Sequence, residues 1–144
     1  MAGKPDCIFC KIVRAELPAA RVFESETLMA FLDVNPVVPG HLLLITKDHY
    51  VSLLEASDSA AGELGTVLPR LARAVCQGVD APALNVVANT GREAGQVVDH
   101  LHLHFIPRYG GDRLFGNWPH RAYGLGEQES IRRRIEVALA APST

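Results

Sequence analysis

Residues 99–106 read Asp-His-Leu-His-Leu-His-Phe-Ile, so three histidines stand at every second position and apolar residues fill the positions between them. Successive side chains of a β-strand point to opposite faces. The imidazoles of His100, His102 and His104 are therefore predicted to share one face of a strand, with the apolar residues on the core side. Imidazole acts as nucleophile, proton carrier or metal ligand near neutral pH. The pattern thus predicts a strand with reactive nitrogens on one face.

The spacing of these histidines limits what they can do together. An extended strand rises about 3.3 Å per residue, which places His100 and His104 roughly 13 Å apart. One metal ion held at about 2 Å from each nitrogen cannot bind both. A His-x-His pair could share a metal, so at least one histidine must have another task.

A Cys-x-x-Cys pair near the N-terminus offers further metal ligands. Cys7 and Cys10 have the spacing that lets two thiolates hold one zinc ion, and two imidazoles would complete a tetrahedral site. A disulfide and a pair of reduced thiols are the alternatives. Three cysteines without a secretory leader argue against a disulfide framework, and Cys76 is predicted to be a small apolar residue on a helix face.

The composition is that of an ordinary globular domain. The chain has 144 residues, of which 48% are hydrophobic, and we expect one domain over residues 1–144. A formal net charge of −2 favours neither a nucleic acid nor an anionic membrane as partner. The N-terminal residues lack the apolar run of a signal peptide, and no stretch approaches the ~20 apolar residues of a membrane span. The cytoplasm is the expected compartment.

Five short apolar segments are predicted as strands. They are residues 20–24, 27–33, 42–45, 84–88 and 99–106, the last of which is expected to end at Pro107. The first two flank Ser25-Glu26 and predict a hairpin, and the turn pair Pro39-Gly40 precedes the third.

Two helices complete the expected fold. The longer runs from Ser57 or Asp58 to Gly78, with a kink or a shortened first half expected at Pro69. A C-terminal helix follows an irregular stretch over 109–126. Its apolar face is formed by Ile131, Ile135, Ala138 and Leu139, and its arginines 132–134 are expected to be mostly solvated. The order of elements predicts an α+β domain with a five-stranded, mainly antiparallel sheet, one long central helix and a C-terminal helix.

The loop before the histidine strand adds a possible phosphate site. Glycines in the segment 91–96 would let backbone N–H groups approach an anionic oxygen. A phosphate held there would lie where a neutral imidazole could attack phosphorus and form a covalent intermediate.

These motifs together resemble the histidine triad nucleotide-binding (HIT) superfamily. The resemblance rests on the histidine strand, Cys7-Ile8-Phe9-Cys10-Lys11-Ile12, Ala30-Phe31-Leu32-Asp33, Pro39-Gly40-His41 and the segment from Asn89 to Gln96. It covers residues 6 to about 109 and leaves 110–144 as a divergent segment. Within the superfamily, the chain is similar to bacterial members of the branch that hydrolyses purine nucleoside phosphoramidates. The resemblance implies the HIT-like fold.

The resemblance implies a role for each histidine. His102 would attack the α-phosphate and form a nucleotidyl-histidine that water resolves, and His104 would contact the phosphate. His41 would order the neighbourhood of the nucleophile, and Gln96 belongs to the same catalytic group; the alternative for His41 is an ordinary polar residue at a strand start. In zinc-containing relatives the first histidine joins two cysteines and a further histidine, which implies a structural zinc site. Its ligands here would be Cys7, Cys10, His49 and His100.

The resemblance also implies a nucleotide site and no organic cofactor. Its base would lie between Ile8, Phe9, Ile12, Phe31 and Val34, residues that could otherwise simply be core. Asp33 would bind the ribose hydroxyls, with Asn35 and Asn89 as additional partners, and Gly95 and Val97 complete the set. Val97 stands where many members have Ser or Thr, so this chain has no hydroxyl there to donate to the phosphate or leaving group.

The function implied is that of a nucleotide-binding hydrolase that cleaves substituted nucleoside monophosphates and releases a purine nucleoside monophosphate. A homodimer built on the long helix and an edge strand is implied as well, and Trp118-Pro119 is similar to a C-terminal segment that reaches the partner's active site in some relatives. Three alternatives are a dinucleoside polyphosphate hydrolase or phosphorylase, a non-catalytic nucleotide- or zinc-binding module, and a metallohydrolase with His100 and His102 as ligands.

Overall fold

The structure is a computed structural model that describes residues 3–116 and 118–142. The chain forms two compact units, Met1–Asp112 and Arg113–Thr144. The expectation of a single domain over the whole chain stays a prediction. No helix among the described residues is long and apolar enough to cross a membrane.

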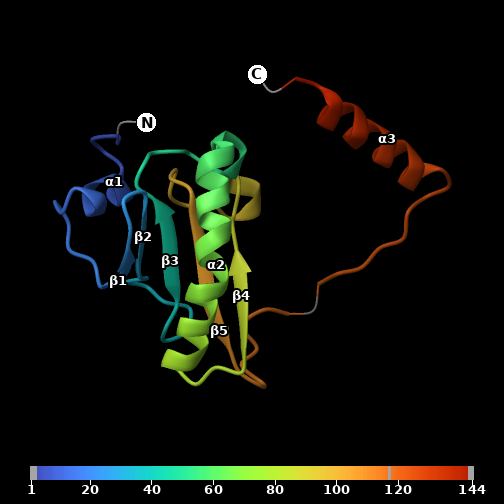
Figure 1. Ribbon diagram of the computed structural model, residues 1–144. Helices are drawn as coiled ribbons and strands as arrows, with labels where there is room; N and C mark the ends of the chain where they lie inside the picture. The colour runs from blue at the N-terminus through green and yellow to red at the C-terminus, as the bar shows by residue number, and fades with distance from the viewer. Residues whose placement is uncertain (1–2, 117, 143–144) are drawn as a thin grey trace. The chain divides into compact units, whose positions relative to one another are not determined.

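The first unit contains a five-stranded antiparallel sheet (Figure 1). Its strands are β1 (Arg21–Glu24), β2 (Leu28–Leu32), β3 (Leu42–Thr46), β4 (Ala83–Val87) and β5 (His102–Arg108). They lie in the order β1-β2-β3-β5-β4, and every neighbouring pair is antiparallel. The predicted hairpin is present as β1 and β2, and the predicted α+β class with a mainly antiparallel sheet is confirmed.

The boundaries of β5 differ from the prediction at both ends. His100 lies just before the strand, which begins at His102, and the strand continues through Pro107 to Arg108. Proline is tolerated there because β3 ends opposite Phe105, so that beyond this residue β5 has a neighbour only in β4. The expectation that Pro107 ends the strand was therefore wrong.

One face of the sheet is covered by α2 (Asp58–Gly78), as Figure 1 shows. The hydroxyl of Ser57 caps the helix by accepting from the amide of Ala60. The helix contributes Leu64, Val67, Leu71 and Val75 to a buried cluster with the sheet residues Leu28, Ala30, Leu42, Leu44 and Phe105. The helix is not shortened at Pro69, because Pro69 and Gly65 lie on its exposed side, where water can bind the Gly65 carbonyl that loses its partner.

The opposite face of the sheet packs against the short helix α1 (Ile8–Val13). Phe9 and Ile12 form a second buried cluster with the sheet residues Met29, Phe31, Leu43 and Ile45. His102 pairs with Ile45 and His104 pairs with Leu43, and paired residues of neighbouring strands share a face. The two histidines therefore lie on the same face of the sheet as α1.

Two 3-10 turns and one further helix complete the described chain. The turns are η1 (Leu53–Glu55) and η2 (Arg92–Ala94), and the helix of the second unit is α3 (Glu127–Ala140). The arginines of α3 are exposed, as predicted, and Arg132 and Arg133 pair with Glu129. None of the residues of α3 is buried within the second unit taken by itself.

Candidate functional site

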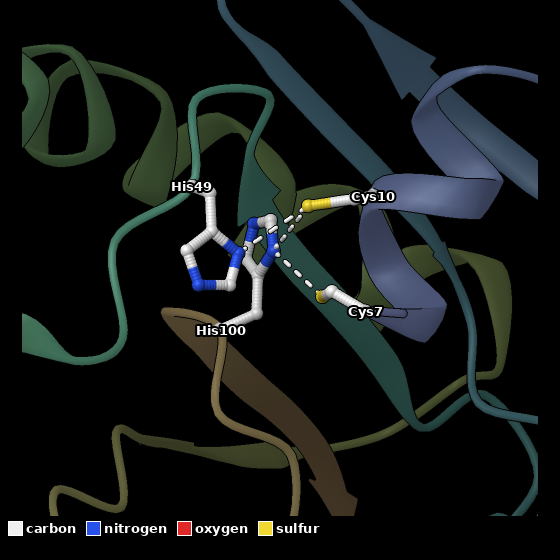
Figure 2. Close-up of side chains that lie close together, drawn as sticks. All are labelled: Cys7, Cys10, His49 and His100. Carbon is white, nitrogen blue, oxygen red and sulfur yellow. Dashed lines mark hydrogen bonds between the residues drawn. The ribbon is translucent and has the colours of Figure 1, made fainter. Parts of the chain in front are cut away.

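A cluster of two cysteines and two histidines joins three separate parts of the chain. Cys7 and Cys10 come from the start of α1, His49 from the segment after β3, and His100 from the residues just before β5 (Figure 2). Nδ1 of His100 lies 3.4 Å from Sγ of Cys7 and 3.6 Å from Sγ of Cys10. Nδ1 of His49 lies 3.3 Å from Sγ of Cys10. The four residues predicted as metal ligands are thus brought together, with all ligand atoms within 4.8 Å of one another.

The geometry of this cluster fits a tetrahedral zinc ion. With Zn–S near 2.3 Å and Zn–N near 2.05 Å, a sulfur and a nitrogen on one tetrahedral ion lie about 3.5 Å apart. The observed separations of 3.3 to 3.6 Å match that spacing. Nε2 of His100 donates to the carbonyl of Thr46 at 2.7 Å, which leaves the Nδ1 lone pair directed into the cluster.

The protonation states of the cluster are set mainly by burial. His100 has no solvent exposure, and its burial lowers the pKa to about 4, so the ring is neutral at pH 7. Burial also lowers the pKa of His49 and raises that of the Cys10 thiol. A neutral imidazole is the form that binds a metal, whereas a thiol must lose its proton when the metal binds.

His102 is oriented by the backbone. Its Nδ1 lies 2.6 Å from the carbonyl oxygen of His100. A carbonyl can only accept, so Nδ1 of His102 carries a proton, and in the neutral ring Nε2 keeps a free lone pair. The ring of Phe9 packs against the His102 ring in a T-shaped arrangement, with centroids 5.2 Å apart. The arrangement suits a nucleophile that attacks through Nε2.

A second chain of hydrogen bonds fixes the tautomers of His41 and His104. The amide of Val37 donates to Nδ1 of His41 at 3.1 Å, so the proton of a neutral His41 is on Nε2. That Nε2 lies 2.9 Å from Nδ1 of His104, which therefore accepts. The proton of His104 is then on Nε2, available to a bound anion. The rings of His102 and His104 lie 4.9 Å apart between centroids.

Both histidines of this hydrogen-bonded series, His41 and His104, are neutral at pH 7. Burial, followed by the neighbouring His102 and His41, lowers the pKa of His104 to about 4. Burial also lowers the pKa of His41, against the opposing charge of Asp33. The pair can offer a hydrogen bond to a phosphate without adding charge.

Asp33 lies close to these histidines but does not form an evident metal site with them. Its Oδ2 is 3.8 Å from Nε2 of His41, and its Oδ1 accepts from the amide of Asn35. Although Asp33, His41 and His104 are close enough to hold an ion, Nε2 of His41 carries a proton and cannot coordinate one. A hydrogen-bonded chain accounts for this geometry better than a metal.

Gln96 is mostly buried and stabilises the loop over residues 91–96 through hydrogen bonds. Its Oε1 accepts from the amide of Gly91, and its Nε2 donates to the carbonyls of Val51 and Val98. The amides of Ala94, Gly95 and Gln96 also bond within the loop, and Asn89 donates to the carbonyl of Gly95. These groups thus build the turn before the histidines, and a direct role of Gln96 or Gly95 toward a substrate stays a prediction.

The residues predicted to contact a base fall into two groups. Phe9, Ile12 and Phe31 belong to the buried cluster under α1, as the core interpretation of these residues also predicts. Ile8 and Val34 are exposed, as is Val97, which is 89% exposed at the end of the loop. Asn35 lies beside Asp33 in the connection between β2 and β3.

Three contacts of the site have no sequence signature. The carbonyls of Thr46 and His100 and the amide of Val37 fix the tautomers of three histidines, and backbone groups are present at every residue whatever its side chain. The packing of Phe9 against His102 could have been suspected only from the position of Phe9 between two cysteines that were predicted to share a metal with His100, two residues before His102.

An antiparallel five-stranded sheet with a histidine pair on one face and a Cys₂His₂ cluster beside it defines a histidine triad domain. A model of the HIT domain family matches residues 14–111. The chain belongs to the HIT family, as its sequence motifs indicated.

Individual relatives agree with this assignment. The chain is 42% identical to "Protein hit" of Bacillus subtilis over 139 residues, which cover 94% of this chain and 96% of that protein. It is 38% identical over 120 residues to adenosine 5'-monophosphoramidase hnt1 of Schizosaccharomyces pombe, covering 83% and 80% of the two chains. The crystal structure of SMU.412c from Streptococcus mutans UA159 superposes with a TM-score of 0.91 at 32% identity, covering 96% of this chain and 88% of that one.

Proposed function

We propose that this protein is a nucleotide hydrolase that cleaves substituted nucleoside monophosphates of the phosphoramidate type through a covalent intermediate on His102. The observation that carries the proposal is the 2.6 Å contact between Nδ1 of His102 and the carbonyl of His100, which leaves Nε2 as a directed, unprotonated nucleophile. The naming of a 38% identical relative as an adenosine 5'-monophosphoramidase supports a purine nucleotide as the substrate.

The reaction proceeds in two displacements at phosphorus. Nε2 of His102 attacks the α-phosphorus, an N–P bond forms, and the bond from phosphorus to the leaving nitrogen breaks as that nitrogen takes up a proton from solvent. Water then attacks the nucleotidyl-histidine, releases the nucleoside monophosphate and restores the neutral imidazole. The Nε2 proton of His104 donates a hydrogen bond to the phosphoryl oxygen on which charge accumulates.

Two residue groups hold the nucleotide in this proposal. Asp33 accepts from the ribose hydroxyls, with Asn35 and Asn89 beside it, and the exposed side chains of Ile8 and Val34 cover the base. His41 positions His104 through the bond between their rings. The predicted role of Gln96 is indirect, because its hydrogen bonds hold the loop before the histidines.

The Cys₂His₂ cluster is proposed to hold a structural zinc ion. Cys7, Cys10, His49 and His100 would supply four ligands and leave no open position, so zinc would fix the fold around the site and take no part in the reaction. A metallohydrolase with His100 and His102 as ligands is disfavoured, because the ring of His100 faces the cysteines while Nδ1 of His102 faces a carbonyl.

A homodimer is proposed as the active assembly. Among the described strands β4 pairs only with β5, so its outer edge is open to a second copy. Trp118, which is exposed in the second unit, is the residue proposed to approach the partner's site.

Release of AMP from adenosine phosphoramidate, followed by chromatography, tests the proposed activity. The wild-type protein should release AMP catalytically, and His102→Ala should lower kcat/KM at least about 1000-fold. His120→Ala, which removes an exposed histidine outside the triad, should retain activity. Binding of AMP without any turnover would instead support the non-catalytic module.

A further inference from the structure

The helix α1 carries residues of both sites on its six-residue length. Cys7 precedes it and Cys10 lies within it, and both face the histidines of the metal cluster. Phe9 lies between them in sequence and packs edge-on against the nucleophile His102 and against Phe31, with ring centroids 5.2 and 5.6 Å apart. The same short helix thus contacts the metal cluster and the catalytic face of the sheet.

The position of α1 depends on tertiary contacts. A helix this short is unstable alone in water, and its N-cap residue Cys7 makes no capping hydrogen bond through its side chain. It is held by the burial of Phe9, Cys10 and Ile12 and by a 3.1 Å hydrogen bond from Arg21 to the carbonyl of Ile12. A metal that binds both cysteines to His49 and His100 would therefore lower the freedom of α1.

His100 provides a second connection between the sites. Its ring lies in the metal cluster, 5.8 Å from the ring of Phe9 and 4.9 Å from that of His49 between centroids. Its carbonyl holds Nδ1 of His102 at 2.6 Å. A metal that fixes the His100 ring therefore also restrains the acceptor that orients the nucleophile.

We propose that Phe9 and His100 are positioning residues that couple the metal cluster to the nucleotide site, so that zinc raises nucleotide affinity and a bound nucleotide raises zinc affinity. The inference rests on the proposed nucleotide function. In this proposal zinc and the nucleotide both require α1 to be packed on the sheet. The conformational entropy of α1 is lost when the first ligand binds, so the second ligand binds without that cost. Linkage requires the two effects to be equal, and coupling of this kind is typically worth roughly 5- to 150-fold in affinity.

The test is a thermodynamic cycle on the full chain. The dissociation constant of AMP is measured by calorimetry for zinc-loaded protein dialysed free of excess metal and for protein stripped with a chelator. The zinc dissociation constant is measured separately by competition with a chromophoric chelator, with and without saturating AMP. The expected result is an AMP affinity roughly 5- to 50-fold higher with zinc, and an equal gain in zinc affinity with AMP.

Two variants separate coupling from folding. Phe9→Leu fills most of the same volume without the ring, so it should still bind zinc and AMP but should lower the coupling factor at least threefold. Cys76→Ser, which removes a thiol outside the cluster, should leave the factor unchanged. A general loss of stability would weaken binding in both metal states and leave their ratio intact.

The possible failures point to different claims. If both metal states bind AMP with affinities within twofold of each other, the coupling is refuted while the proposed function stands. If neither state binds AMP, the proposed function fails and the coupling with it. A Phe9→Leu variant with the full coupling factor would overturn the role assigned to Phe9.

Discussion

His100 and His102 lie two residues apart and are joined by a 2.6 Å contact from the carbonyl of the first to Nδ1 of the second. The ring of His100 meanwhile lies 3.4 Å from the sulfur of Cys7. One residue therefore belongs to the Cys₂His₂ cluster through its side chain and contacts His102 through its backbone. The tautomer of His102, the proposed nucleophile, follows from this arrangement.

The ring tautomers can be measured directly. Nitrogen-15 NMR at pH 7.5 should show His102 protonated at Nδ1, and His41 and His104 protonated at Nε2, because each partner atom is a fixed donor or acceptor. In His41→Ala the tautomer of His104 should become mixed, while that of His102 should not change. A His102 ring protonated at Nε2 in the wild-type protein would contradict the assigned nucleophile.

A hydroxyl at position 97 should favour substrates with an amine leaving group. Val97 is 89% exposed, so Val97→Ser should not affect folding. Its hydroxyl could donate to a leaving nitrogen, and a hydrogen bond worth ~1 kcal/mol would raise kcat/KM for adenosine phosphoramidate about 3- to 10-fold. Kinetics with this substrate and with an adenylyl anhydride, whose leaving group departs as an anion, check the difference. An equal gain in Val97→Ala would exclude the hydroxyl as the cause.

The half-buried His104 should make the stability of the protein depend on pH. Its pKa is lowered from 6.5 to about 4 in the folded state, so the unfolded chain binds a proton over a range where the folded chain does not. The contribution of His104 to the free energy of unfolding should therefore be complete above pH 6.5 and should decrease as the pH falls toward 4. The contribution of this residue is on the order of 3 kcal/mol.

Urea unfolding from pH 4 to 7.5 gives that dependence. His104→Asn retains an acceptor at the δ position for His41 but does not titrate, so its stability should change less with pH than that of the wild type. Parallel curves for the two proteins would show that His104 is not the group responsible.

Metal removal should lower stability. The protein purified under reducing conditions should contain one zinc per chain by elemental analysis, and stripping the metal should lower Tm by on the order of 10 °C. Cys7→Ser/Cys10→Ser should contain no zinc, whereas Cys76→Ser should retain it. Full zinc content in the double variant would rule out the proposed ligands.

Much of the fold could be predicted because local patterns agreed with the final packing. The hydroxyl cap at Ser57 marked the start of the long helix, because a capping side chain acts within the first turn, and the helix ends at Gly78 as predicted, with Val79 as its C-cap. The extent of β5 could not be predicted in this way. Whether a proline ends a strand depends on where the neighbouring strand stops, and that depends on the sheet as a whole.

The candidate site shows the same division. The alternation of histidines correctly placed His102 and His104 on one face of the sheet, whereas His100 lies just before the strand. That the three histidines have different tasks stays a prediction. The contacts that orient the rings of His100, His102 and His41 come from the carbonyls of Thr46 and His100 and from the amide of Val37. Residue types do not indicate which backbone groups the tertiary structure will bring together.

The central claim is that His102 becomes covalently nucleotidylated during turnover. Intact-protein mass spectrometry after rapid mixing with excess adenosine phosphoramidate and acid quenching measures this directly. The wild-type protein should show a transient adenylyl adduct that disappears as the substrate is consumed, and His102→Ala should show none. Steady AMP release by wild-type protein without any adduct at the shortest times, or an adduct of equal amount in His102→Ala, would contradict the claim.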